Sequence, residues 1–124
     1  MNGNQYQELA MRTNDGMCTQ RLRKMADFEM GYGYTDFAGI VNACFGLSGE
    51  VGEINDMVKK WVFHGHKMDK EELEKEIGDV MWYVALICTS LHIDLEEVMG
   101  KNIDKLKKRY PEGFSEKASV ERSE

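Results

Sequence analysis

A five-residue phrase occurs twice in this chain and constrains its fold more than any other feature. Residues 50–54 and 76–80 both read acid, β-branched apolar residue, glycine, acid, β-branched apolar residue. Two residues that are three positions apart share one face of an α-helix. If both phrases are helical, each one therefore presents a pair of carboxylates on one face. The pairs are Glu50 with Glu53 and Glu76 with Asp79.

Each acidic pair borders an apolar stripe when the residues are placed at about 100° each around a helix. The stripe beside the first pair contains Ile54, Val58 and Trp61. The second acidic pair borders an apolar stripe in the same way. Packing the two stripes together would bring four carboxylates close. Two like charges about 4 Å apart repel by roughly 4 kcal/mol at an effective dielectric of about 20. A hard divalent cation with oxygen ligands, Mg²⁺ or Mn²⁺, is the simplest group that would neutralise them.

The competing interpretation is a solvated helix surface, because a single E-x-x-E pair is common on exposed helices. Two copies in matching register against apolar stripes favour a site instead. Each copy also contains a glycine, Gly52 or Gly78. A glycine inside a helix costs roughly 1 kcal/mol relative to alanine. Its use in both copies indicates either a close approach of the helices or space for a ligand.

Composition narrows the class of protein. A chain of 124 residues with 42% apolar and 31% charged residues is expected to be one ordered domain that gains stability from oligomerisation. A net charge of −6 argues against binding a nucleic-acid polymer. The chain contains no apolar run of about 20 residues and does not begin like a signal peptide. The spacing of its three cysteines forms no disulfide framework, so we expect a cytoplasmic location.

Apolar periodicity predicts an all-α fold, a bundle of four to five helices with short turns. The expected helices are 4–13, 19–30, 35–63, 69–92 and 94–110. Residues 1–114 are expected to form the helical domain, and residues 115–124 a mobile polar tail. His64 and His66 flank a glycine at the end of the long helix. Solvated residues that end a helix explain them better than metal ligands do.

The last predicted helix is basic near its carboxyl end. Asn102, Lys105 and Arg109 lie on one face of it through their i, i+3, i+7 spacing. A lysine and an arginine one turn apart, beside a divalent metal, suit a polyphosphate. The alternative is that these cations only complement the helix dipole and keep the surface soluble.

With these residues in place, the chain resembles the MazG-like, all-α nucleoside triphosphate pyrophosphohydrolases. The signature of that family is E-x-x-E, a spacer and E-x-x-D, and here the spacer has 22 residues, 54–75. The surrounding sequence agrees at 47–53, at 76–80, at Asn102-x-x-Lys105 and at 109–114. The resemblance covers about residues 4–114. One departure is Gly49, where many members have a further glutamate.

The resemblance implies hydrolysis of a nucleoside triphosphate between its α- and β-phosphates, which gives a nucleoside monophosphate and pyrophosphate. Carried over by position, the four acids would bind Mg²⁺, with Mn²⁺ possible, and Glu50 or Glu53 would also accept the proton of the attacking water. Lys105 and Arg109 would hold phosphates, with Asn102 beside them. The family also implies a homodimer or homotetramer whose sites a partner chain completes.

The base pocket is less well specified by the sequence. Trp61 lies near the inward face of the carboxylate-bearing helix, and Phe45 precedes the first motif by about one turn. Either ring could stack on a nucleobase, although aromatic residues at helical spacing are more often part of a core.

Two other functions are alternatives to this one. A dinuclear carboxylate oxidase in a four-helix bundle needs two E-x-x-H motifs, and no glutamate here has a histidine three residues later. A non-catalytic module that binds a nucleotide, or a helical interaction or regulatory module, remains the alternative, and turnover separates it from the enzyme.

Overall fold

The computed structural model describes residues 1–27, 29–30 and 33–122, and at 29–30 and 33–34 it describes the backbone alone. The chain consists of two compact units, residues 1–38 and residues 39–124. Each unit has its own set of internal contacts.

The first unit contains short elements only. They are α1 (Gly3–Ala10), the 3₁₀ helix η1 (Met11–Thr13), α2 (Cys18–Ala26), β1 (Glu29–Met30) and β2 (Gly33–Tyr34). Asn2 caps α1: its side chain accepts a hydrogen bond from the Gln5 amide at 2.9 Å, and the Gln5 side chain accepts one from the Asn2 amide at 2.8 Å. This reciprocal pair is a capping box, which satisfies two amides that the first helical turn leaves unpaired.

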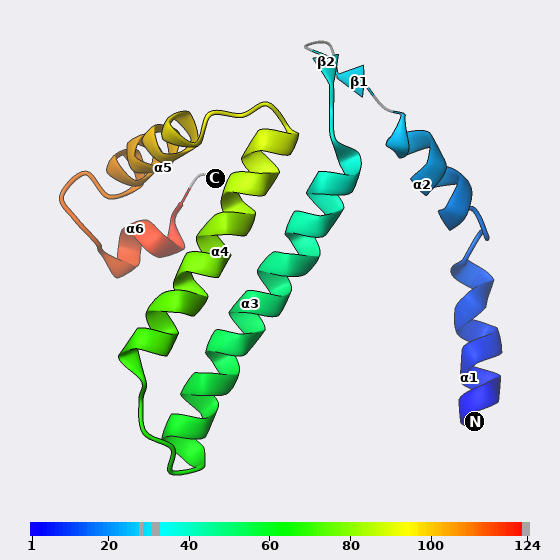
Figure 1. Cartoon of the computed structure of the whole chain (residues 1–124), viewed down its shortest axis with the longest axis horizontal. Coiled ribbons are helices and arrows are strands. Elements are labelled where there is room, and N and C mark those ends of the chain that lie inside the picture. Colours follow the sequence, from blue (N-terminus) through cyan, green and yellow to red (C-terminus); the bar gives the residue numbers. More distant parts are fainter. Residues whose placement is uncertain (28, 31–32, 123–124) are drawn as a thin grey trace. The chain divides into compact units, whose positions relative to one another are not determined.

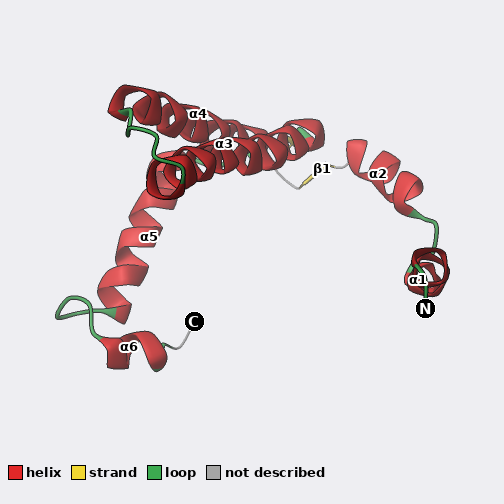
Figure 2. Ribbon diagram, turned by 90° about the horizontal axis from the view of Figure 1, so that it is seen from below, coloured by secondary structure: helices red, strands yellow, loops and turns green. Residues whose placement is uncertain are grey.

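The second unit is built on a long helical hairpin. Its elements are α3 (Phe37–Phe63), whose first two residues belong to the first unit, α4 (Lys70–Ser90), α5 (Leu95–Arg109) and α6 (Glu116–Val120). Figures 1 and 2 both show α3 and α4 lying side by side and antiparallel, joined by the short connection 64–69. We call this pair the α3–α4 hairpin.

Local signals in the sequence set the ends of these helices. Asp69 caps α4 by accepting a hydrogen bond from the Glu72 amide at 3.1 Å, and Asp94 caps α5 by accepting one from the Glu96 amide at 3.0 Å. At the end of α3 the amides of His64 and His66 both donate to the Lys60 carbonyl, and Gly65 has φ +70°. Glycine adopts that left-handed conformation without the cost a side chain would add.

The all-α class expected from the sequence is confirmed, and the helices lie close to their predicted ranges. Two details differ. The helix expected over 19–30 ends at Ala26, and Glu29–Met30 instead forms β1, which pairs antiparallel with β2 (Gly33–Tyr34) in the expected break at 31–34. Residues 28, 31 and 32 of this stretch lie outside the described part of the chain. The stretch expected to be a polar tail contains α6, which Ser115 caps by accepting a hydrogen bond from the Ala118 amide at 3.1 Å. The last two residues of that tail lie outside the described part of the chain.

Helices α3 and α4 approach each other closely at Gly46. A Cβ atom built on Gly46 would overlap the ring of Tyr83, whereas a Cβ at Gly52 or Gly78 would meet nothing within 4 Å. The two motif glycines are therefore not points of close helix approach, which corrects one of the two interpretations that the sequence allowed. Gly46, outside both motifs, has that role because only a hydrogen atom fits beneath the aromatic ring.

The apolar core of the described residues is thin. Ala43 and Cys88 are its buried apolar residues, and no large side chain is fully buried. On α3 the stripe expected to face inward stays largely exposed, since Val51, Val58 and Trp61 are 44%, 37% and 48% exposed. The physical reason is that two helices cover only one side of each other, so the rest of each stripe needs another partner.

Within the described residues, no helix is both long enough and apolar enough to cross a bilayer.

The Gly46 contact generates a stability prediction. Replacing a helical glycine by alanine normally stabilises a helix by up to about 1 kcal/mol. In Gly46→Ala the new methyl group overlaps the Tyr83 ring, and overpacking of this kind costs about 1–3 kcal/mol. We expect Gly46→Ala to lower the melting temperature, measured by the helical circular dichroism signal.

Gly49→Ala is the matched control, because a Cβ at Gly49 meets nothing within 4 Å. That variant should be as stable as the wild type or more stable. Equal stability of the two alanine variants would contradict the close approach at Gly46.

Candidate functional site

The antiparallel register of the hairpin places the two acidic motifs opposite each other. Gly46 lies four residues before Glu50, and Tyr83 lies four residues after Asp79. A register that opposes Gly46 to Tyr83 therefore also opposes Glu50 to Asp79, one helical turn further along both helices. One more turn along, it opposes Glu53 to Glu76.

The carboxylates meet as this register requires. One carboxylate oxygen from each of Glu50, Glu76 and Asp79 lies within 4.8 Å of the others. The carboxyl group of Glu53 is within hydrogen-bonding range of Glu76. Glu50 and Glu76 are half-buried, while Glu53 and Asp79 are exposed. We call these four residues the acidic cluster.

The pKa of Glu53 shows that like charges repel one another within the acidic cluster. The pKa of Glu53 is raised above its ordinary value, first by the hydrogen bond with Glu76 and by the negative charge of that residue. Partial desolvation and the charge of Asp79 add to the effect. A carboxyl group that holds its proton more tightly than usual reports a surplus of negative charge around it.

The donor set fits a hard divalent cation. All four groups are carboxylates, which are the ligands that Mg²⁺ and Mn²⁺ prefer. In addition, Glu76 Oε2 is buried without a hydrogen-bond partner among the described residues. A buried polar atom without a partner costs free energy, and a cation at the centre of the cluster would satisfy it.

Neighbouring lysines are engaged with other acids. Lys75, next to Glu76 in the sequence, pairs with Glu72 at 2.8 Å. Lys59 and Lys60 both pair with Asp56, at 3.3 Å and 2.6 Å. These pairs keep the ammonium groups of three lysines on carboxylates outside the acidic cluster.

The residues expected to bind phosphate lie on α5. The side chains of Asn102 and Lys105 are exposed and that of Arg109 is half-buried. Lys101, on the same helix, pairs with Glu97 at 3.6 Å. The helix that carries the i, i+3, i+7 spacing therefore forms as expected, and the role of its three residues in binding phosphate stays a prediction.

The two aromatic residues proposed for the base lie at different distances from the cluster. Phe45 is 75% exposed on α3, five residues before Glu50. Trp61 is 48% exposed and lies eleven residues after Glu50, about 16 Å along the helix axis. Their role in binding a base also stays a prediction.

The sequence reasoning missed an aromatic pair that is closer to the cluster on α4. Trp82 and Tyr83 follow Asp79 by three and four residues, and their rings meet edge to face, with centroids 5.0 Å apart and planes at 84°. Trp82 is 58% exposed. The signal was present in the sequence as two aromatic residues one turn beyond the second motif, and the same helical spacing that paired the acids would have found it.

The comparison with protein families supports what the geometry indicates. The model of the MazG nucleotide pyrophosphohydrolase domain matches residues 43–114, more than half of the chain. The chain belongs to the MazG nucleotide pyrophosphohydrolase family. The MazG match contains all four carboxylates and the α5 residues, and it coincides with most of the second structural unit.

The chain is similar to two proteins whose names indicate no function. The chain is 37% identical over 79 residues to the Gene 37 protein of Mycobacterium phage L5, an alignment that covers 60% of this chain and 69% of that protein. It is 28% identical over 95 residues to the uncharacterized protein YvdC of Bacillus subtilis, covering 69% of this chain and 89% of YvdC. No solved structure matches the chain.

The raised pKa of Glu53 generates a prediction about stability and pH. The folded protein holds the Glu53 proton more tightly than the unfolded chain does. The carboxylate therefore destabilises the fold once the pH rises above the pKa of Glu53 in the folded state. This destabilisation is absent when the pH falls below the ordinary value of 4.5. Without divalent cations, Glu53→Gln should melt at a higher temperature than the wild type at pH 7, and the advantage should shrink toward pH 4.5.

Glu112→Gln, which alters an exposed glutamate outside the cluster, is the control and should show no such pH-dependent gain. If Glu53→Gln is no more stable than the wild type at pH 7, then the repulsion that we infer within the cluster is wrong.

Proposed function

We propose that this protein is a Mg²⁺-dependent nucleoside triphosphate pyrophosphohydrolase. It cleaves a (d)NTP between the α- and β-phosphates to give a (d)NMP and pyrophosphate, a reaction suited to removing unwanted nucleotides from the cellular pool. The observation that carries the proposal is the meeting of Glu50, Glu76 and Asp79, with Glu53 beside them, inside the matched MazG region.

The four acids have different parts in this proposal. Glu50, Glu76 and Asp79 hold the cation, because their oxygens form the compact group. Bound Mg²⁺ supplies neutralisation of the negative charge on the phosphate oxygens during the displacement. Glu53 lies outside that compact group and is exposed, which suits it to accept a proton from the attacking water. Glu50 is the second candidate for that role.

The remaining site residues act on the ends of the nucleotide. Lys105 and Arg109 on α5 bind phosphate oxygens, with Asn102 as a hydrogen-bonding neighbour. Trp61 or Phe45 stacks on the base, and Trp82 is a further aromatic residue within one turn of Asp79. Mn²⁺ can replace Mg²⁺ at an all-oxygen site of this kind.

We also propose that the active form is a homodimer or homotetramer. The support is the uncovered apolar surface of the hairpin, where Val51, Val62, Ile77 and Met81 are each 44% to 59% exposed. Apolar surface contributes about 25 cal/mol for each Å² removed from water, so a second copy that covers these side chains would be stabilised appreciably. The protein is proposed to act in the cytoplasm on free nucleotides, with no nucleic-acid polymer or membrane as a partner.

Turnover is the test of this function. Purified protein with Mg²⁺ should release pyrophosphate, rather than orthophosphate, from at least one member of a panel of canonical and modified nucleoside triphosphates. Glu76→Gln should reduce the rate to background because it removes a half-buried ligand. The rates are measured with a coupled pyrophosphate assay in the presence and absence of a chelator.

Glu74→Gln is the matched control, since Glu74 is an exposed glutamate on the same helix, and its rate should match the wild type. Folded protein that releases no pyrophosphate from any nucleotide in the panel would overturn the proposal and favour a non-catalytic nucleotide-binding or helical interaction module.

A further inference from the structure

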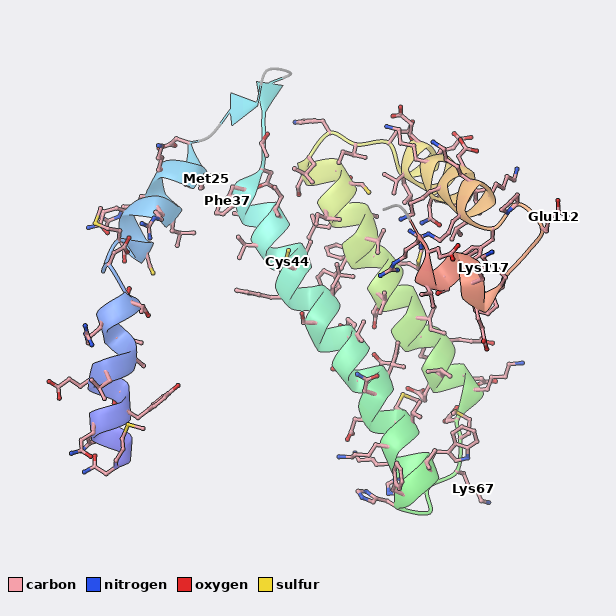
Figure 3. The ribbon with its side chains drawn as sticks, turned by 180° about the vertical axis from the view of Figure 1, so that it is seen from behind. Met25, Phe37, Cys44, Lys67, Glu112 and Lys117 are labelled. Atoms are coloured by element: carbon pink, nitrogen blue, oxygen red, sulfur yellow. The ribbon has the colours of Figure 1, made fainter. Side chains whose placement is uncertain are left out.

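Charged residues are distributed unevenly along the length of the α3–α4 hairpin. Residues 37–49 of α3 and 80–90 of α4 contain no charged side chain, and the aromatic residues Phe45, Trp82 and Tyr83 lie there. The acidic cluster occupies the middle. Beyond it, toward the connection that Lys67 marks in Figure 3, lysines and histidines gather, and acids lie among them. The basic residues are Lys59, Lys60, His64, His66, Lys67 and Lys70.

One of these cations points along the same side of α3 as the acidic cluster. Lys60 follows Glu53 by seven residues, which brings it back to within about 20° of the Glu53 direction. Asp56 lies between them in the sequence, and its carboxylate pairs with the Lys60 ammonium at 2.6 Å. The ion pair with Asp56 therefore holds the Lys60 side chain on the carboxylate-bearing face of the helix.

The local charge balance leaves this cation able to take another anion. Two ammonium groups, those of Lys59 and Lys60, share the single carboxylate of Asp56, so the group carries one net positive charge. Two acids at this end of the hairpin are engaged elsewhere: Glu72 pairs with Lys75 at 2.8 Å, and the Asp69 side chain caps α4. A second anion arriving at Lys60 would thus meet the net positive charge of the group formed by Lys59, Lys60 and Asp56.

The separation from the cluster suits a nucleotide. Glu53 and Lys60 are about 10 Å apart along the helix axis at 1.5 Å per residue. An extended lysine side chain and the polyphosphate of a bound nucleotide together bridge such a distance. We propose that Lys60, positioned by Asp56, is a substrate-contacting residue whose ammonium donates to an oxygen of the nucleotide held at the acidic cluster. This inference rests on the proposed function.

The oxygens of a nucleotide that accept such a hydrogen bond belong either to the phosphates or to the nucleoside, where they are base carbonyl and sugar oxygens. A lysine ammonium is a compact point charge, and phosphate is the anion it commonly binds. We therefore expect Lys60→Ala to weaken inhibition by tripolyphosphate. Base-free tripolyphosphate, used as a competitive inhibitor, separates the two sources because it offers phosphate oxygens alone.

The experiment compares Lys60→Ala with Lys59→Ala in the full chain. Each variant removes one of the two ammonium groups on Asp56, but Lys59 points about 100° away from Lys60 around the helix. Lys60→Ala should raise KM for the nucleotide about tenfold or more, the range expected for losing a hydrogen bond to a charged group. Its kcat should change by less than about threefold. Lys60→Arg should bring KM back close to the wild-type value, and Lys59→Ala should leave the wild-type KM unchanged.

The outcomes separate this inference from the function on which it rests. If tripolyphosphate inhibition weakens in step with KM, the contact is to phosphate; if the nucleotide KM alone rises, the contact is to an oxygen of the nucleoside. An active wild type whose Lys60→Ala and Lys59→Ala variants share its KM and melting temperature overturns the role of Lys60 and leaves the function standing. A wild type that neither hydrolyses nor binds any nucleotide with Mg²⁺ overturns both.

Discussion

The repulsion among four carboxylates at the middle of the α3–α4 hairpin is the interaction on which the rest of the structure depends. Helices of a small domain gain stability by burying apolar stripes, yet here each stripe carries an acidic pair at its edge. The raised pKa of Glu53 and the unpartnered, buried Glu76 Oε2 are two consequences of packing those stripes together. A positive charge placed among the oxygens would relieve both, and that links the fold to the proposed metal-dependent reaction.

The contact between Gly46 and Tyr83 fixes where that repulsion occurs. An antiparallel hairpin can slide, and any slip would end the opposition of Glu50 to Asp79 and of Glu53 to Glu76. Gly46 under the Tyr83 ring favours the observed register, because a Cβ atom at that position would overlap the ring. The helix register and the position of the acidic cluster are therefore coupled. Gly46, at the close contact between the helices, lies one turn from the carboxylates that this register brings together.

Much of the helical architecture could be predicted from the sequence, because capping residues and apolar periodicity act locally. Asp69 and Asp94 mark their helix starts through one side-chain hydrogen bond each. The spacing of Glu50, Glu53, Glu76 and Asp79 was also enough to expect that they meet. What the sequence did not reveal depends on the geometry between helices. Gly46 and the pair of Trp82 and Tyr83 acquire their meaning only once the register is known, and the exposure of Val51 and Val58 follows from how little a two-helix hairpin can cover.

The central claim is that Glu50, Glu76 and Asp79 share a bound cation with Glu53 beside it, and a crystal structure of the protein grown with Mn²⁺ tests it most directly. Mn²⁺ scatters anomalously, so its position can be read without assumptions about the ligands. The account predicts an anomalous peak within about 2.0–2.5 Å of oxygens from Glu50, Glu76 and Asp79, the range typical of hard divalent cations, with Glu53 next to it. Carboxylates that turn away from one another with no metal between them would contradict the account.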